Sequence, residues 1–176
     1  MDAIACRPAV PADALCLGVL ALQVFLDTYA RQGIRPALAR EALERGSRES
    51  FEALIADPLE CVLVAERAGH LVGFAHLRAA TPHAQVGDPT AAELCRLYVQ
   101  EPFTGRGVGR ALLREAERAA AARGAGTLWL TAWDGNARAL AFYPRQGYAH
   151  VGDTLYTFEG ESYGNFLFAR RLGDPA

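Results

Sequence analysis

The feature that most constrains this chain is a glycine-rich segment between a predicted strand and a predicted helix. Glycines occupy positions 105, 107 and 109, after an extended apolar run over residues 93–99 and at the start of a helical pattern over residues 109–123. Glycines leave backbone N–H groups uncovered, and the start of a helix attracts anions through its dipole. The segment therefore predicts a cradle for a phosphate or pyrophosphate.

Composition indicates an ordinary globular protein of one domain over residues 1–176. The chain is 51% hydrophobic and 22% charged, and its formal net charge is −2. This charge argues against a nucleic-acid partner bound through a broad basic face. The four cysteines, Cys6, Cys16, Cys61 and Cys95, form no CxxC pair. We therefore expect no disulfide framework, no metal site and a reducing, cytoplasmic location.

An apolar stretch over residues 14–26 requires an interpretation of its own. It follows Asp2 and Asp13, contains Gln23 and lacks the cleavage site of a signal peptide. It is too short to span a bilayer. We interpret it as a buried first helix and expect no membrane partner.

The remaining pattern predicts alternating strands and helices. We expect strands over residues 3–8, 61–66, 71–77, 93–99, 127–133, 148–158 and 163–172, and helices over 11–29, 37–56 with a break at 46–47, 109–123 and 136–143. The turn at residues 67–70 joins a hairpin, and residues 79–91 form a loop. This order predicts an α/β (α+β) domain with a mixed sheet.

Two familiar phosphate-binding turns fit the glycines poorly. A P-loop requires Lys and Ser or Thr after its last glycine, whereas Arg110 and Ala111 follow Gly109 here. A dinucleotide-binding turn requires GxGxxG directly after a strand, but the spacing here is GxGxG and residues 100–104 intervene. Asp134 lies near the place of that fold's acidic residue, but a hairpin precedes the motif instead of another strand–helix unit.

Two segments together resemble motifs of the GNAT superfamily of acetyl-CoA-dependent N-acetyltransferases. Residues 104–109, Thr-Gly-Arg-Gly-Val-Gly, are similar to the glycine loop of its motif A, and residues 136–148 are similar to its Asn-x-x-Ala-x-x-Phe-Tyr…Gly-Tyr segment. The likeness covers nearly the whole chain. It implies a mixed, mostly antiparallel sheet of about six or seven strands flanked by about four helices. It also implies direct acetyl transfer in a ternary complex, or alternatively a non-catalytic acyl-CoA-binding module on the same fold.

The resemblance implies where acetyl-CoA, as co-substrate, is bound. The pantetheine arm is expected along Leu97, Tyr98 and Val99, where an N–H of Tyr98 or Val99 is the candidate oxyanion donor. Asn136 matches a residue that contacts the same arm, and it also suits a helix N-cap. The pyrophosphate is expected on the loop and helix start formed by Thr104, Gly105, Arg106, Gly107, Val108, Gly109 and Arg110.

The resemblance also implies two catalytic residues. Tyr143 matches the family's general acid, and a phenol with a pKa near 10 can protonate a thiolate whose thiol has a pKa near 8.5. Glu93 matches the glutamate that serves some members as base, acting through a water. Two departures stand out: Thr104 replaces the usual Gln or Arg, and Pro144 follows Tyr143, where proline can end or kink the helix.

The other candidate residues favour structural roles. We expect Cys95 to be a small core residue, Trp129 to pack in the core, and His70, His76 and His83 to be structural. For the acceptor, the resemblance implies an amine of a small molecule or peptide. Residues 27–29, 97–99 and 131–133 look most like the spermidine/spermine acetyltransferase branch. The sequence leaves the oligomeric state open, a homodimer included.

Overall fold

The structure is a computed structural model that describes residues 4–158 and 161–173. The chain divides into two compact units. Unit 1 comprises Met1–Leu77 and Arg96–Ala116, and unit 2 comprises Arg78–Cys95 and Glu117–Ala176. Strand β4 (Ala92–Val99) and helix α4 (Val108–Ala122) each contribute residues to both units. The expectation of a single domain stays a prediction.

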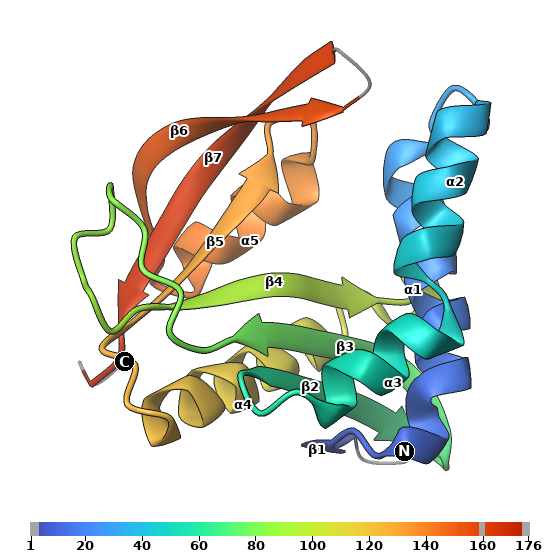
Figure 1. The fold of residues 1–176 in the computed structure, drawn as a ribbon, viewed down its shortest axis with the longest axis horizontal. Coiled ribbons are helices and arrows are strands. Elements are labelled where there is room, and N and C mark those ends of the chain that lie inside the picture. The colour runs from blue at the N-terminus through green and yellow to red at the C-terminus, as the bar shows by residue number, and fades with distance from the viewer. Residues whose placement is uncertain (1–3, 159–160, 174–176) are drawn as a thin grey trace. The chain divides into compact units, whose positions relative to one another are not determined.

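The described strands hydrogen bond in the order β1-β2-β3-β4-β5-β7-β6 (Figure 1). Pairs β1/β2, β5/β7 and β6/β7 are antiparallel, and β4/β5 is parallel. This arrangement confirms the predicted mixed, mostly antiparallel sheet. The other strands are β1 (Ala5–Pro8), β2 (Glu60–Arg67), β3 (His70–Arg78), β5 (Thr127–Trp133), β6 (Ala149–Phe158) and β7 (Glu161–Arg171).

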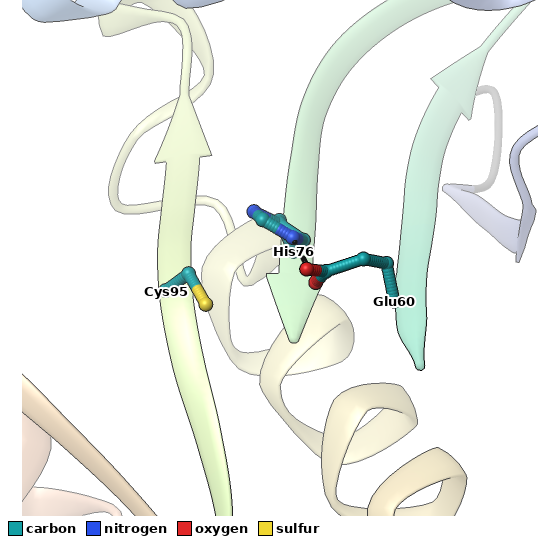
Figure 2. Close-up of side chains that lie close together, drawn as sticks. All are labelled: Glu60, His76 and Cys95. Carbon is teal, nitrogen blue, oxygen red and sulfur yellow. Dashed lines mark hydrogen bonds and ion pairs between the residues drawn. The ribbon is translucent and has the colours of Figure 1, made fainter. Parts of the chain in front are cut away.

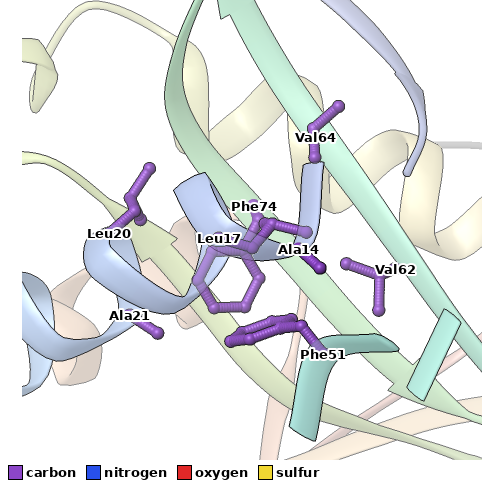
Figure 3. Close-up of a cluster of buried hydrophobic side chains, with 8 residues drawn as sticks. All are labelled: Ala14, Leu17, Leu20, Ala21, Phe51, Val62, Val64 and Phe74. Atoms are coloured by element: carbon purple, nitrogen blue, oxygen red, sulfur yellow. The ribbon is translucent and has the colours of Figure 1, made fainter. Parts of the chain in front are cut away.

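Unit 1 holds a core between its N-terminal helices and strands β2 and β3. The helices are α1 (Ala14–Tyr29), α2 (Pro36–Arg45) and α3 (Arg48–Ala56), which confirms the predicted break at residues 46–47. Figure 3 shows the Phe51 side chain of α3 and the Leu17 side chain of α1 in one buried cluster. Phe51 also meets Phe74 of β3 edge to face, with ring centroids 5.4 Å apart. The full cluster is Ala14, Leu17, Leu20, Ala21, Phe51, Val62, Val64 and Phe74.

The predicted buried first helix is therefore confirmed. The longer helical segment Pro11–Tyr29, of 19 residues, is nevertheless long and apolar enough to cross a membrane by length and composition alone. The apolar run over residues 14–26 is itself too short for a bilayer, but the helical segment extends beyond that run on both sides. Core helices pass the same test, and Ala14 and Leu17 are fully buried inside unit 1.

The predicted hairpin in unit 1 has a compact turn. Ala68 and Gly69 between β2 and β3 have φ values of 50° and 77°. A two-residue turn with both central residues at positive φ matches the twist of antiparallel strands, and glycine adopts such a φ without strain. The turn brings β2 and β3 into one hairpin, which carries Val62, Val64 and Phe74 into the core.

Unit 2 contains β5, β6, β7 and helix α5 (Ala137–Arg145), with β7 between β5 and β6 (Figure 1). A bulge between His150 and Gly152 shifts the β6/β7 register. Trp129 and Leu167 pack with Ala91 in one cluster. Leu128 and Phe168 are also buried, and they alternate with Trp129 and Leu167 along their strands. Both faces of this part of the sheet are therefore covered.

Helix α5 ends two residues beyond the predicted boundary near Tyr143. It continues through Pro144 to Arg145, and Pro144 lies inside the last turn. Proline has no backbone N–H, so the helix lacks the one hydrogen bond that residue 144 would donate to the carbonyl four residues earlier. The last turn is instead closed by N–H groups that follow the helix, and Tyr143 O accepts bonds from Gln146 and Tyr148.

Candidate active site

The glycine loop of unit 1 has the backbone that an anion cradle requires. Gly105 and Gly107 have φ values of 70° and 84°, a region that favours glycine. A Cβ built on either residue would meet nothing within 4 Å. The loop therefore presents open backbone, and its conformation depends on glycine itself.

Helix α4 follows directly and supplies the donors. Its first ladder bond runs from Ala111 N–H to Gly107 O at 2.9 Å, so the N–H groups of Val108, Gly109 and Arg110 belong to the first turn. First-turn N–H groups have no acceptor within their helix and carry the positive end of its dipole. Val108 is fully buried and anchors this turn. The donors and the open glycines fit a bound pyrophosphate.

The side chains around the cradle contribute unequally. The Thr104 hydroxyl donates to Glu101 O at 2.9 Å, so the residue that replaces the family's Gln or Arg serves the turn before the helix. Arg106 and Arg110 are exposed. Exposed guanidinium groups beside a phosphate site add attraction that salt screens.

Strand β4 offers backbone donors on the side that faces away from β3, which we call its outer edge. Gln100 N–H donates to Val72 O of β3 at 3.0 Å, and a Cβ on Gly73 would lie 2.7 Å from Tyr98 O. Tyr98 and Gln100 therefore direct their backbone groups toward β3. Because these directions alternate along a strand, Val99 N–H points away from β3. The geometry favours Val99 over Tyr98 as the oxyanion donor.

The side chains of this strand segment differ in their surroundings. Tyr98 lies with its ring centroid 5.3 Å from that of Phe74, and burial raises the pKa of its phenol. Leu97 and Val99 are half-buried. The Tyr98 side chain therefore packs in the unit 1 core, and this packing fixes the backbone position of the neighbouring Val99.

Glu93 lies in unit 2, in the short parallel pairing of β4 with β5. Its register partner is Trp129, and its side chain is half-buried. Cys95 is exposed, so the prediction of a core cysteine was wrong. The buried residues at this end of the strand are Ala92 and Leu94, and strand alternation places Cys95 on the other side together with Glu93.

Trp129, the register partner of Glu93, is buried as predicted. Its indole N–H donates to Thr81 O at 2.7 Å, and its ring contacts that of His83 with centroids 4.8 Å apart. His83 Nδ1 accepts a bond from Gln85 N–H at 3.3 Å. These contacts give His83 the structural role expected from the sequence, and they fasten the loop of residues 79–91 to β5.

Asn136 begins helix α5 and caps it. Its Oδ1 accepts from Ala139 N–H at 3.1 Å, which confirms the capping role that the sequence offered. The side-chain amide nitrogen is a further donor on the same group. Contact between Asn136 and a cofactor stays a prediction.

Tyr143 lies near the other end of α5 and is 8% exposed. Its ring centroid lies 5.7 Å from that of Tyr148 and 5.9 Å from that of Phe168. The Tyr148 hydroxyl donates to Glu117, and burial is the main cause that raises the pKa of this phenol far above its usual value. Tyr148 closes the second motif but received no role from the sequence, and Glu117 and Arg170 were not indicated, because the contacts of these three residues join distant parts of the chain.

A second feature missed by sequence is a buried acid–imidazole pair in unit 1. Figure 2 shows the Glu60 carboxylate against the His76 ring, with Oε2 and Nε2 2.7 Å apart. The two side chains are 8% and 6% exposed. This contact bonds β2 to β3 through the His76 ring, and the structural role of His76 stays a prediction. Cys95, also drawn in Figure 2, belongs to unit 2. The expectation of no metal site stays a prediction.

Comparison with known proteins assigns the family. A model described as "Acetyltransferase (GNAT) family" matches residues 25–148. An N-acetyltransferase in the pepI 3′ region of Lactobacillus delbrueckii subsp. lactis is 23% identical over 150 residues, which cover 85% of this chain and 87% of that protein.

Solved structures share the fold. The PaiA N-acetyltransferase of Thermoplasma acidophilum in complex with coenzyme A shares the fold with a TM-score of 0.73 at 23% identity, covering 96% of this chain and 99% of that one. YncA of Salmonella typhimurium, with acetyl-CoA, has a TM-score of 0.69 at 19% identity, covering 99% and 96%. The chain therefore belongs to the acetyltransferase (GNAT) family of acetyl-CoA-dependent N-acetyltransferases.

Proposed function

We propose that this chain transfers the acetyl group of acetyl-CoA directly to a primary amine of a small molecule or peptide, in a ternary complex. The observation that carries the proposal is the cradle at the start of α4. Gly105 and Gly107 adopt positive φ with open space above them, and the first-turn N–H groups of α4 follow. This is the backbone that the family uses to bind the pyrophosphate of coenzyme A.

The proposed binding of the cofactor relies mainly on backbone. The N–H groups of residues 106–110 would donate to the pyrophosphate, and Arg106 and Arg110 would add charge. The outer edge of β4 at Leu97 and Val99 would bond the pantetheine arm, and Asn136 would contact the same arm from the start of α5. Thr104 is assigned to the turn before α4, where its hydroxyl is bonded.

Three groups of the chain are assigned to the chemistry. The amine nitrogen attacks the thioester carbon, and Val99 N–H donates to the oxygen on which negative charge develops. One such donor lowers the barrier by about 3 kcal/mol. Glu93 accepts the amine proton through a water. The carbon–sulfur bond breaks, and the Tyr143 hydroxyl protonates the departing thiolate.

The acceptor class is the finer part of the proposal. A polyamine, as in the spermidine/spermine branch, requires several carboxylates to receive its charges. Glu93 and Asp27 are the only two acidic residues that the sequence suggests for this purpose, and α2 adds no net charge because its Arg40 and Arg45 are balanced by Glu41 and Glu44. We therefore favour a monoamine or a peptide amine over a polyamine.

The test is a thiol-release assay with acetyl-CoA and a panel of monoamines, polyamines and peptides between pH 6 and 9, alongside calorimetric titration with coenzyme A. Amine-dependent thiol release, with an acetylated amine found by mass spectrometry, would support the proposal. Tight coenzyme A binding without amine-dependent release in any arm would overturn it and favour the non-catalytic acyl-CoA-binding module. Faster turnover of polyamines than of monoamines would overturn only the preferred acceptor class.

A further inference from the structure

We infer that Tyr148, held by Glu117 and Arg170, is a positioning residue for Tyr143. The inference rests on the proposed role of Tyr143 as general acid. It assigns a function to a buried polar cluster in unit 2 that neither cofactor binding nor the chemical steps use. The cluster is linked to Tyr143 by bonds and ring contacts within that unit.

The first link is the backbone at the end of α5. Tyr148 N–H donates to Tyr143 O at 3.1 Å, and Gly147 N–H donates to Pro144 O at 3.0 Å. Gly147 has a φ of 85°. These two bonds and the left-handed glycine define a Schellman motif around the C-cap residue Gln146. Tyr143 lies three residues before this C-cap, and Tyr148 lies two residues after it.

The second link is between side chains. A Schellman motif is commonly accompanied by an apolar contact between these two positions. Here it is the contact between the rings of Tyr143 and Tyr148, tilted by 66° with centroids 5.7 Å apart. Tyr148 thus touches Tyr143 both at its carbonyl and at its ring, and a displacement of Tyr148 would be transmitted to the proposed acid.

The third link fixes Tyr148 itself. Its hydroxyl donates to Glu117 Oε1 at 3.0 Å, and the same oxygen accepts from Arg170 Nη1 at 3.1 Å. Tyr148 is 3% exposed, and the side chains of Arg170 and Glu117 are 19% and 15% exposed. Charge-assisted bonds in such surroundings are stronger and more directional than those on the surface.

The fourth link closes the cluster on the helix end. Arg170 Nη1 also donates to Gln146 O at 3.1 Å, so one guanidinium binds both the Tyr148 anchor and the residue after α5. A Cβ on Gly147 would lie 3.8 Å from Arg170 Nε. The C-terminal end of α5 is therefore bonded to two other elements, to α4 through Glu117 and to β7 through Arg170.

Pro144 explains why the helix end requires this support. Proline offers no N–H to the carbonyl of Leu140, so the ladder lacks one bond in the turn that carries Tyr143. The cap bonds that follow Pro144 tie Tyr143 down from the C-terminal side instead. The missing bond at Pro144 would loosen the turn that carries Tyr143, and the cluster compensates for this loss.

The experiment is a double-mutant cycle in the chain of 176 residues, with the variants Tyr148→Phe, Tyr143→Phe and both together. Tyr156→Phe, at an exposed tyrosine of β6, is the matched control. Each is assayed for kcat and KM with acetyl-CoA and the best amine of the panel. We expect Tyr148→Phe to lower kcat about tenfold with KM for acetyl-CoA nearly unchanged, because a small misplacement of a catalytic group costs rate. In the Tyr143→Phe background the same change should have no further effect.

The outcomes separate the two proposals. An equal loss from Tyr148→Phe in both backgrounds would overturn the positioning role, because the residue would then act without Tyr143. An unchanged kcat in Tyr148→Phe, with a large loss in Tyr143→Phe, would overturn it as well and leave the acid in place. An unchanged kcat in Tyr143→Phe would overturn the acid and, with it, this inference.

A second measurement requires no acceptor amine. Amide hydrogen exchange at Gly147 and Tyr148 should accelerate about tenfold in Tyr148→Phe and in Glu117→Ala, but not in the Tyr156→Phe control. Glu117→Gln, which keeps an acceptor oxygen for the Tyr148 hydroxyl, should exchange nearly as slowly as the parent protein. Unchanged exchange in Glu117→Ala would contradict the anchoring role of Glu117.

Discussion

The glycine loop of unit 1 and the end of α5 in unit 2 present their functional groups by different means. The loop relies on backbone: Gly105 and Gly107 at positive φ and the first-turn N–H groups of α4. The end of α5 relies on side chains: the Tyr143 ring lies against Tyr148, whose hydroxyl is bonded to Glu117. A backbone site depends on which residues are glycine, whereas a side-chain site depends on neighbours from elsewhere in the fold.

The largest effect should come from removing the side-chain group itself. Tyr143→Phe keeps the ring that packs against Tyr148 and Phe168 but deletes the proton donor. We expect kcat to fall about 10²- to 10³-fold with KM for acetyl-CoA nearly constant, because a general acid contributes on that order. Steady-state kinetics with the best amine measure this. A loss of less than threefold would mean that the thiolate is protonated by another group.

A backbone change in the loop should act on binding instead. Gly107→Ala places a side chain at a φ of 84°, a strained conformation for alanine, although no neighbour lies within 4 Å of the new Cβ. We expect the Kd for coenzyme A to rise about tenfold, measured by calorimetric titration. Thr104→Val is the matched control, because its hydroxyl bonds to Glu101 and not to the cradle, and it should change Kd less than threefold. Equal effects of the two variants would contradict a backbone-based site.

A change in an ion-pair cluster of unit 1 can test whether coenzyme A binding at the glycine loop depends on side chains outside the loop. Arg7 bonds to Asp13 and to Glu66, and its guanidinium holds the pKa of both carboxyl groups below their usual values. A depressed carboxyl pKa stabilises the fold above the unfolded pKa, near 4, and this stabilisation is lost as the pH falls through the folded value.

Arg7→Met should therefore lower the Tm at pH 7 by about 2 °C, and by less below pH 3, because the pairs are partly exposed. Thermal unfolding followed by circular dichroism at both pH values measures this. The Kd for coenzyme A at 25 °C should stay within twofold of that of the parent protein. A deficit in Tm that grows on acidification, or a weakened Kd, would contradict the argument.

The smallest effect is expected from Pro144→Ala. Alanine restores an N–H to the last turn of α5, but the cap bonds from Gly147 and Tyr148 already close that turn. We expect kcat to change less than twofold and the Tm to shift by about 2 °C or less, since the regained bond is offset by the greater freedom of the unfolded chain. A kcat that increases fivefold or more would show that proline misplaces Tyr143 in the parent protein.

Local patterns were sufficient to predict most of the fold. The hairpin turn at Ala68 and Gly69, the break at Gly46 and the glycine-initiated α4 are all encoded by residues near one another in sequence. Helix α5 extends two residues beyond its predicted end near Tyr143, because residues after the helix supply its closing bonds. The prediction of a core position for Cys95 was wrong, because Cys95 alternates with the buried Ala92 and Leu94.

The parts of the site that the sequence did not indicate depend on long-range contacts. Tyr148 and Glu117 are 31 residues apart, and Arg170 and Glu117 are 53 apart. Nothing in the spacing of these residues relates them, since α4, the segment after α5 and β7 meet only in the tertiary structure. The choice of Val99 over Tyr98 likewise required the bond from Gln100 to Val72.

The exposed cysteines affect how activity can be measured. Cys16 on α1 and Cys95 on β4 are both exposed, whereas Cys61 is buried. A reagent that detects the thiol of released coenzyme A also reacts with accessible protein thiols, at a rate set by their thiolate fraction. Exposed thiols of the enzyme therefore add to the signal before any turnover. A slow acceptor will be recognised only when the released thiol clearly exceeds the signal from the protein thiols, or when the acetylated amine is detected by mass spectrometry.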